Sequence, residues 1–328
     1  MRFSEYMQNW LYGESGYYRD FKDIGKSGDF YTAVSTSRFF GASIANYFYS
    51  LIEEDTTKRD GWLIEIGAHR GYLISDMIQW LYTVDKSLID TLKFGIVEKE
   101  PKLQKEQLAY IKSRFGSDIK IEHFTSLDEV NINYAFFISN EIFDAFPCEL
   151  IKDGQMAYVE NHKISWGEID KNILDTTKKY RQIKGEVSIG FEDFAKRLFN
   201  SVERCDFISF DYGERLVRND FSIRVYTKHN VYPLFDKELK LEEVYKRADI
   251  TYDVNFAHLI DSFLENGFEL KIYETQARAL VRFGIIDILD MFRKNTTQSR
   301  YLREVDKIKT LIAPTIMGDK FKMIHFQK

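Results

Sequence analysis

The chain has 328 residues, of which 44% are hydrophobic and 30% charged, the balance of a soluble globular protein. Its formal net charge of −5 argues against a general attraction to nucleic acid or anionic lipid, and no run of about 18 apolar residues predicts a membrane span. Cys148 and Cys205 lie far apart, and neither they nor the six histidines have metal-ligand spacing. We therefore expect free thiols, no metal, no signal peptide and a cytoplasmic location.

The first 60 residues are predicted to be mostly helical, with a loop in the middle. Ser4 is a suitable N-cap for a short helix that ends near Gly13. Residues 25–32, GKSGDFYT, are glycine-rich and polar and predict a loop. An amphipathic helix follows, with an apolar face formed by Phe40, Ile44, Tyr47 and Leu51.

The stretch 61–71, GWLIEIGAHRG, predicts a strand followed by a tight turn. Residues 62–66 form a short apolar run that contains one acid, Glu65, and Gly67 and Gly71 bracket the turn. The face of a helix comes next, marked by Ile74, Met77, Ile78 and Leu81. Glycines at such a turn let the backbone approach a ligand closely. The alternative is an ordinary tight strand-to-helix connection.

Strands and helices alternate from residue 61 to residue 147. The further predicted strands in this region are the apolar runs Phe94–Val97 and Tyr134–Ile138 and the alternating segment Ile119–Phe124. Strands separated by helices predict parallel pairing in a doubly wound α/β sheet, which binds ligands beyond the carboxyl ends of its strands. The polar residues or glycines at those ends are Gly67, Glu98, Thr125, Asn140 and Glu141.

The remaining chain is predicted to add insertions to this sheet. Asp153-Gly154 indicates a hairpin, which we expect to extend or cap the sheet, and residues 171–186 are polar enough for a solvated loop or exposed helix. A helix follows at 191–198, then a strand at 207–210, and residues 214–249 are expected to form a lid or loop. The last predicted elements are helices at 256–263, 285–292 and 301–312 and strands at 270–275 and 322–327.

We therefore expect one α/β catalytic domain with insertions rather than several domains. Its parts are an N-terminal cap (1–60), a ligand-binding core (61–147), an inserted hairpin and helix (148–200) and the remaining sheet (201–328).

Glu98 is the acid best placed to bind a ribose. It lies 33 residues beyond Glu65 (98 − 65 = 33), after the second strand, where an acid accepts hydrogen bonds from ribose hydroxyls in dinucleotide-binding folds. The alternative is a surface acid paired with Lys99.

Seven motifs carry a resemblance to a known family. In chain order they are GDFYT (28–32), EIGAHRG (65–71), NEIFDAFP (140–147), FDYG (210–213), DIT (249–251), TQA (275–277) and APTIMGDKFK (313–322). The series, which covers nearly the whole chain, resembles the MidA family of S-adenosylmethionine-dependent methyltransferases. That family includes an arginine methyltransferase of mitochondrial complex I assembly.

The resemblance implies a class I, Rossmann-like methyltransferase fold and S-adenosylmethionine as cofactor. The glycine turn would take the amino-acid end of the cofactor, and Glu98 would hold the ribose. The residues that the resemblance places at the cofactor are Asp29, Thr32, Glu65, Gly67, Ala68, Gly71, Glu98, Thr125, Ser126 and Asn140.

The resemblance also suggests a protein arginine as methyl acceptor. A guanidinium stays protonated and forks onto carboxylates. Glu141, Asp144 and Asp211 would orient it and receive its proton, and Tyr212 would line the same cleft. Two alternatives stay open: Asp144 as a helix N-cap and Asp211 as a turn residue before Gly213.

Two departures from the family pattern bear on function. His69 stands where family members usually carry glycine, so its imidazole either crowds the cofactor or points away, unless it acts as a base. Ser35 stands where the family usually carries glutamate. The rival hypotheses are a catalytically weakened assembly factor of the same fold and a methyltransferase for a small metabolite.

Overall fold

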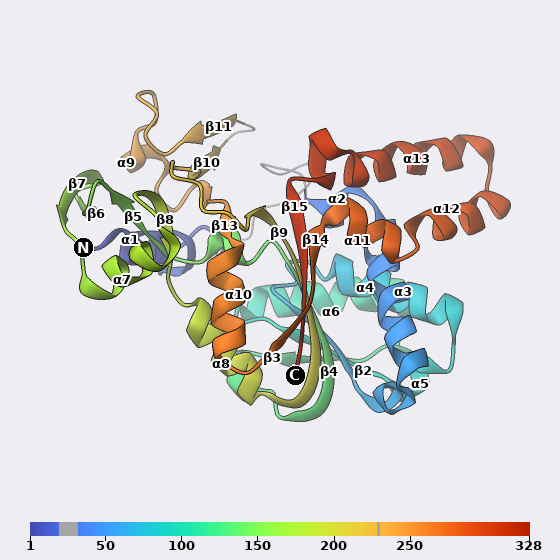
Figure 1. Cartoon of the computed structure of the whole chain (residues 1–328). Coiled ribbons are helices and arrows are strands. Elements are labelled where there is room, and N and C mark those ends of the chain that lie inside the picture. Colours follow the sequence, from blue (N-terminus) through green and yellow to red (C-terminus); the bar gives the residue numbers. More distant parts are fainter. Residues whose placement is uncertain (20–31, 228–229) are drawn as a thin grey trace. The chain divides into compact units, whose positions relative to one another are not determined.

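The computed structural model describes residues 1–19, 32–227 and 230–328 (Figure 1). These residues separate into two compact units, which we describe in turn. The sheet unit comprises Thr32–Asn140, Lys196–Phe210 and Gly267–Lys328. The insert unit comprises Met1–Tyr31, Glu141–Ala195 and Asp211–Asn266. The prediction of a single domain stays a prediction.

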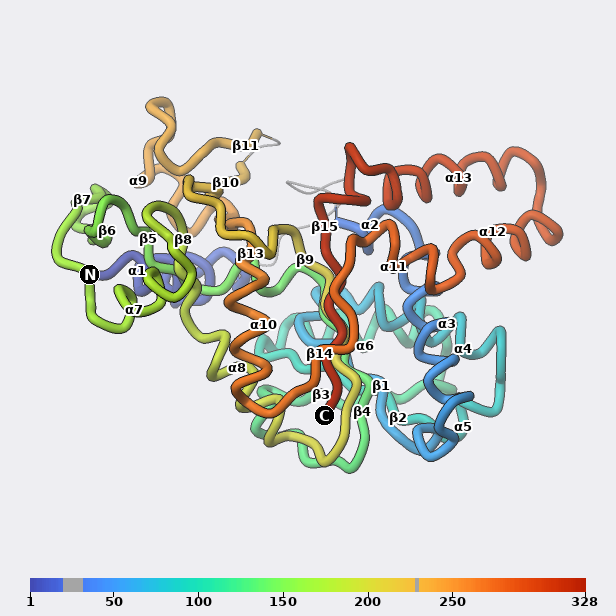
Figure 2. Tube along the Cα trace, in the orientation of Figure 1, coloured from blue at the N-terminus to red at the C-terminus, as the bar shows by residue number. Residues whose placement is uncertain are grey.

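The sheet unit is built on a doubly wound sheet with the strand order β14-β15-β9-β4-β1-β2-β3. Neighbours among β1, β2, β3, β4 and β9 pair in parallel, whereas β14 and β15 run side by side and antiparallel (Figure 2). The strands are β1 (Trp62–Ile66), β2 (Lys93–Val97), β3 (Ile121–Phe124), β4 (Ile132–Asn140), β9 (Val202–Glu214), β14 (Glu269–Thr275) and β15 (Phe321–Gln327). The predicted α/β fold class is confirmed.

Helices connect and cover these strands. They are α2 (Ala33–Thr36), α3 (Arg38–Glu54), α4 (Tyr72–Val84), α5 (Leu88–Thr91), α6 (Pro101–Phe115), α11 (Gln276–Arg282), α12 (Ile285–Lys294) and α13 (Gln298–Ile312), with short turns at Thr56–Asp60, Leu127–Glu129 and Pro314–Gly318. The predicted apolar face of α4 is buried, which explains why its sequence periodicity located it correctly. Helix α11 is not among the elements predicted from the sequence.

A buried ionic network lies inside the sheet unit. One carboxylate oxygen of Asp206 accepts hydrogen bonds from Lys58 Nζ and the Tyr134 hydroxyl, both at 2.9 Å. The other lies 2.9 Å from His325 Nε2 and 3.2 Å from Gln327 Nε2. Burial alone would raise the pKa of Asp206, but the hydrogen bonds and charges of His325 and Lys58 hold it at about 2. Asp206 is thus a fully satisfied buried charge.

The insert unit contains two small sheets and an aromatic core. One sheet has the order β7-β6-β5-β8 and the other β11-β10-β12. The strands are β5 (Cys148–Lys152), β6 (Gln155–Glu160), β7 (Lys163–Glu168), β8 (Lys184–Ser188), β10 (Arg224–Thr227), β11 (Asn230–Pro233) and β12 (Asp249–Thr251), and β13 (Val254–Asn255) pairs with the end of β9. The helices are α1 (Phe3–Tyr12), α7 (Lys171–Tyr180), α9 (Leu241–Val244), α10 (Phe256–Glu265) and the turn Phe143–Ala145; α8 (Phe191–Asn200) crosses the unit boundary.

Three sequence expectations for this unit are met only in part or not at all. The hairpin at Asp153-Gly154 forms, but β5 and β6 belong to a separate sheet and do not extend the main one. Residues 171–180 form α7, a largely exposed helix as one of the two alternatives predicted, whereas residues 184–186 belong to β8, where Glu186 is buried and accepts backbone N–H groups. Ser4 is not the N-cap of α1: Arg2 holds that position, and the Ser4 hydroxyl donates to buried Glu149.

The helices, cysteines and acidic or histidine side chains of the described residues have the following properties. None of the helices there has the length and apolar character of a membrane span. Cys148 and Cys205 are both buried and unpaired, as predicted. Across the same residues, no group of three or more histidine, cysteine or acidic side chains is arranged to hold a metal ion.

Candidate active site

The carboxyl ends of four neighbouring strands meet at one edge of the sheet unit. Because β1 pairs in parallel with β2 and β4, and β2 with β3, their last residues lie level. The Gly67 N–H donates to the last carbonyl of β2 at 3.2 Å, and the Glu98 N–H donates to the last carbonyl of β3 at 2.8 Å. Gly67, Glu98 and Thr125 therefore follow neighbouring strands at the same edge, and Asn140 ends the fourth strand. We call this edge the rim.

The turn after β1 alternates in backbone conformation. Gly67, His69 and Gly71 have φ of 72°, 46° and 75°, so every second residue is left-handed. Glycine adopts this region freely, whereas a residue with a β-carbon does so at a cost. A hydrogen bond of 2.7 Å from the Gly71 N–H to the Ala68 carbonyl closes the turn. The conformation explains why a Gly-x-Gly-x-Gly pattern suits this turn and why His69 is an unfavourable choice.

Glu65, inside β1, forms a hydrogen bond to the helix that follows the turn. Its side chain is buried, with 3% of the residue exposed, and its Oε2 accepts the Ile74 N–H at 2.9 Å. That N–H belongs to the first turn of α4, where backbone donors lack helical partners. Burial raises the pKa of Glu65 to about 8. The geometry therefore assigns Glu65 to holding β1 and α4 together, and its predicted cofactor contact stays a prediction.

Glu98 is anchored by the backbone and by a glutamine. Its Oε1 accepts the Glu100 N–H at 2.9 Å, and its Oε2 lies 3.4 Å from Gln107 Nε2. Gln107 Nε2 also donates to the His69 carbonyl at 2.7 Å, and Gln107 Oε1 lies 2.8 Å from His123 Nε2. Burial raises the pKa of Glu98 and lowers that of His123. One network thus joins the ends of β2 and β3 to the glycine turn. Glu98 takes part in this network and does not form the ion pair with Lys99 that was the alternative.

Gln107 is the rim residue that the sequence analysis missed. It is fully buried on α6, four residues after Leu103 and four before Ile111, which are also buried. A polar residue on an otherwise apolar helix stripe is the signal that predicts a buried hydrogen-bonded role.

The other predicted cofactor residues have varied surroundings. The Thr125 N–H and hydroxyl both bind the Glu129 carboxylate, and Ser126 precedes the short turn at Leu127–Glu129. Thr32 caps α2, because its hydroxyl accepts the Ser35 N–H at 3.2 Å. Asp29 and the rest of the 25–31 loop lie outside the described residues. The roles of these residues stay predictions.

The three predicted acceptor acids come together in the insert unit. Asp211 is fully buried, and its Oδ2 accepts the N–H groups of Phe143 and Asp144 at 2.9 and 3.3 Å. Its Oδ1 accepts the Tyr212 N–H at 2.9 Å. Burial and the nearby charges of Asp144 and Glu141 raise the pKa of Asp211. These contacts give direct support to the turn-stabilising alternative for Asp211.

Asp144 differs from Asp211 in the pairing of its two oxygens. Its Oδ2 lies 2.5 Å from the Tyr212 hydroxyl, which itself lies 2.5 Å from Thr251 Oγ1. Its buried Oδ1 has no hydrogen-bond partner among the described residues. Burial raises the pKa of Asp144 to about 6, although the Tyr212 hydrogen bond and the charge of Arg224 oppose the shift. Asp144 lies inside the turn Phe143–Ala145, so the N-cap alternative is wrong.

The side chains around this carboxylate were only partly foreseen. The Arg224 guanidinium lies over the Tyr212 ring at 4.7 Å and donates to Asp253 Oδ1 at 2.8 Å. Glu141 has a left-handed backbone with φ of 53°, a conformation that residues other than glycine adopt mainly at strained or functional positions. We call Glu141, Asp144, Asp211 and Tyr212 the carboxylate cluster. The charged residue Arg224 was missed because its place depends on the β10–β12 pairing.

The strand order, the glycine turn and the acid after the second strand define a class I methyltransferase architecture. Comparison with protein families makes this specific: residues 43–274 match the family described as "Putative S-adenosyl-L-methionine-dependent methyltransferase". The chain belongs to this family, which confirms the resemblance seen in its motifs. It is an S-adenosylmethionine-dependent methyltransferase.

Individual relatives agree with this membership. The chain is 21% identical over 371 residues to the rat mitochondrial protein arginine methyltransferase NDUFAF7, covering 98% of this chain and 79% of the relative. It is 25% identical over 280 residues to the Caenorhabditis elegans homolog, covering 74% and 63%. A COG1565 superfamily protein of Burkholderia thailandensis, bound to S-adenosyl-homocysteine, has the same fold with a TM-score of 0.85 and 20% identity, covering 100% of this chain and 88% of that one. These relatives are named as mitochondrial or bacterial proteins, and the cytoplasmic location of this chain stays a prediction.

Proposed function

We propose that this methyltransferase acts on arginine side chains of a protein. The observation that carries the proposal is the buried Asp144 carboxylate, which has one oxygen held by Tyr212 and one without a hydrogen-bond partner. The names of the similar relatives, which are protein arginine methyltransferases, support the same acceptor. A buried polar atom without a partner is costly, so its presence suggests a donor that arrives with the substrate.

The rim fits the cofactor on the evidence of its own residues. Side chains are absent at Gly67 and Gly71, so the turn offers its backbone to the amino-acid end of S-adenosylmethionine. Glu98 has two oxygens for ribose hydroxyls, and Gln107 fixes one of them in place. The cofactor supplies an electrophilic methyl group on a sulfonium, and the role of the rim is to position it.

The carboxylate cluster has the chemistry to hold a guanidinium. A guanidinium presents five N–H donors in a planar fork, and an oxygen of an ionised carboxylate accepts such donors in charge-assisted hydrogen bonds. The Tyr212 hydroxyl fixes Oδ2 of Asp144 and leaves Oδ1 for the substrate. When a guanidinium nitrogen forms a bond to the methyl carbon, the bond from that carbon to the sulfonium sulfur breaks and S-adenosylhomocysteine is released. The nitrogen then loses one proton, and Asp144 with a pKa of about 6 is suited to accept it.

Labelled methyl transfer to arginine peptides tests the proposal. Purified protein is incubated with methyl-labelled S-adenosylmethionine and a peptide library containing arginine or lysine, and the labelled amino acid is identified. We expect methylarginine, with Asp144→Asn losing about 10²-fold or more of the rate while S-adenosylhomocysteine binding is kept. Asp175→Asn, an exposed acid on α7, is the matched control. Label on lysine, or an unchanged rate in Asp144→Asn, would reject the arginine assignment.

His69 favours one second candidate, a weakened assembly factor of the same fold. Its left-handed backbone stands where the family pattern has glycine, which places a β-carbon in the turn expected to take the cofactor. Calorimetry with S-adenosylmethionine and S-adenosylhomocysteine separates the candidates, because an assembly factor of this kind would show no binding of either compound.

A further inference from the structure

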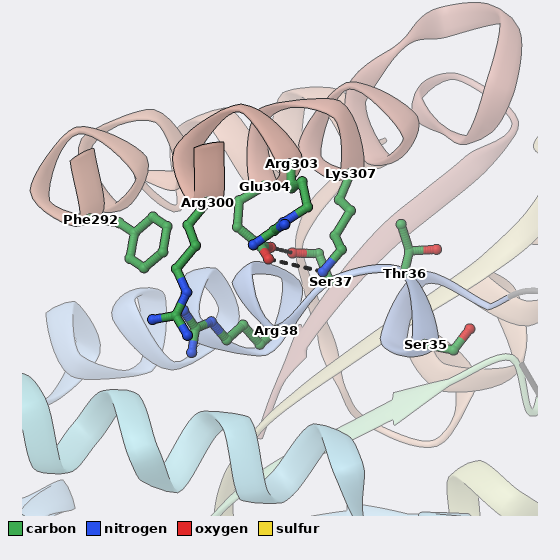
Figure 3. A pocket seen from close by; sticks show the side chains of 9 residues that line it. All are labelled: Ser35, Thr36, Ser37, Arg38, Phe292, Arg300, Arg303, Glu304 and Lys307. Atoms are coloured by element: carbon green, nitrogen blue, oxygen red, sulfur yellow. Dashed lines mark hydrogen bonds and ion pairs between the residues drawn. The ribbon is translucent and has the colours of Figure 1, made fainter. Parts of the chain in front are cut away.

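The sheet unit contains a cation-lined pocket apart from the rim. It has a volume of about 420 Å³ and lies between the start of α3 and the helices α12 and α13 (Figure 3). This volume is within the range of about 300–1,000 Å³ that is typical of small-molecule sites. None of the residues predicted to bind the cofactor lines it.

The charge of the pocket is strongly unbalanced. Arg300, Arg303 and Lys307 lie at positions i, i+3 and i+7 of α13 and therefore share one face of that helix. Arg38 lines the pocket from the start of α3, and Figure 3 shows the Arg38 and Arg300 side chains extending into the space between the two helices. Glu304 is the single acid among the nine lining residues.

That acid neutralises only one of the four cations. Glu304 Oε1 lies 2.9 Å from Lys307 Nζ, and its Oε2 lies 3.3 Å from the Ser37 hydroxyl. Within the described residues, no ion pair joins Arg38, Arg300 or Arg303 to a carboxylate. Arg300 and Arg303 therefore border one cavity without a carboxylate partner in the described part of the chain. Arg38 is attracted to Asp76, which is itself paired with Arg114, without forming an ion pair. An anion would stabilise this arrangement.

The departure at Ser35 adds to the imbalance. This position, where the family pattern has glutamate, lines the same pocket. A carboxylate here would offset one guanidinium, whereas the serine hydroxyl of this chain carries no charge and donates to the Thr32 carbonyl at 3.0 Å. Thr36 and Ser37 also line this side, and their hydroxyls donate to the Thr32 carbonyl at 2.8 Å and to Glu304 Oε2 at 3.3 Å. Ser37 is also the N-cap of the 17-residue helix α3.

We propose that this pocket binds a small molecule through a diphosphate or triphosphate group. Guanidinium forks match phosphate oxygens in geometry, and the excess of three positive charges matches a polyphosphate better than a single carboxylate. The cavity is too small for a folded partner and has the size of a small-molecule site. The proposal adds a second ligand to the methyltransferase and does not depend on the identity of the methyl acceptor.

Calorimetry with inorganic tripolyphosphate at low salt tests the proposal directly. We expect saturable one-site binding that weakens with added salt, and Arg300→Gln combined with Arg303→Gln should lower the affinity by about tenfold or more. Ser35→Glu, which adds a negative charge to the lining, should weaken binding in the same direction. Arg278→Gln combined with Lys105→Gln makes the same change in net charge outside the pocket and should alter the affinity by less than about twofold.

Further ligands and a cofactor-binding control distinguish the possible reasons for a negative result. No binding of tripolyphosphate, or equal weakening in the control variant, would overturn the site. Tighter binding of citrate, of an acidic peptide or of a single-stranded oligonucleotide than of tripolyphosphate would overturn the assignment to a small polyphosphate. S-adenosylhomocysteine affinity is measured in every variant, so a loss of anion binding with cofactor binding intact concerns this pocket alone.

Discussion

Each unit of the molecule contains a buried aspartate, and the two have opposite surroundings. Asp206 in the sheet unit has hydrogen-bond partners on both oxygens, and its pKa is held at about 2. Asp144 in the insert unit has a partner on one oxygen only, and burial raises its pKa to about 6. A buried charge with all its partners inside the protein serves the fold, whereas one with a missing partner is prepared for a ligand.

Removing the fully paired aspartate should have the largest effect on stability. Asp206→Ala leaves Lys58 buried without its partner, so we expect a loss of about 3–5 kcal/mol in the free energy of unfolding. Because the folded pKa of Asp206 is depressed, its stabilising contribution is present above the unfolded pKa and is lost as the pH falls towards about 2. Urea denaturation at pH 7 and pH 3 measures both effects. A loss below 1 kcal/mol at pH 7 would contradict this assignment.

Removing the charge of Asp144 should change the free energy of unfolding in the opposite direction. The folded pKa of Asp144 is raised, so folding disfavours its ionised form and the molecule loses stability as the pH rises from about 4 to 6. Asp144→Asn removes that cost, and we expect it to be neutral or stabilising by up to about 3 kcal/mol at pH 7. Thermal unfolding at pH 7, with Asp175→Asn as control, checks the sign. Clear destabilisation would assign Asp144 to the fold, like Asp206.

Removing polar side chains from the rim should lower the affinity for the cofactor. If Glu98 holds two ribose hydroxyls, Glu98→Ala should weaken S-adenosylhomocysteine binding by more than about 1 kcal/mol. Gln107→Leu, which removes the group that fixes Glu98, should weaken it by a smaller amount. Calorimetry measures both variants. Unchanged affinity in Glu98→Ala would leave only a structural role for its contacts.

A substitution in the glycine turn should have the smallest effect, and it should increase stability. His69→Gly relieves a left-handed residue, and we expect a gain of about 1 kcal/mol in stability. Cofactor affinity should also rise if the imidazole crowds the turn. Thermal unfolding and calorimetry on the same protein measure both quantities. Unchanged or weaker cofactor binding would mean that the imidazole points away from the ligand.

The sequence predicted the rim better than the carboxylate cluster, for a physical reason. Strand β1, its turn and α4 follow from short-range periodicity and glycine placement, and the structure has them where the pattern predicts. The hairpin β5–β6 was also located by its Asp-Gly turn, but the sheet it joins depends on long-range pairing with β8. Turn chemistry is local, whereas sheet membership is a tertiary property.

The individual roles of buried polar residues were harder to predict. Glu186 in β8 looked like a solvated acid, yet its carboxylate accepts the N–H groups of Ser222 and Ile223, which lie 36 and 37 residues away. Asp211 was predicted to be a catalytic acid, whereas in the structure its carboxylate accepts hydrogen bonds from three backbone N–H groups. Such partners come from segments distant in sequence, so no local pattern reveals them.

The pH dependence of arginine methylation tests the central claim most directly. If Asp144 must be ionised to hold the guanidinium and take its proton, kcat/KM for an arginine peptide should rise about tenfold per pH unit below the pKa of about 6 and level off above it. Asp144→Asn should retain S-adenosylhomocysteine binding and show a low, flat profile. A wild-type profile that is flat between pH 5 and 7, or an Asp144→Asn variant with the wild-type profile, would contradict the account.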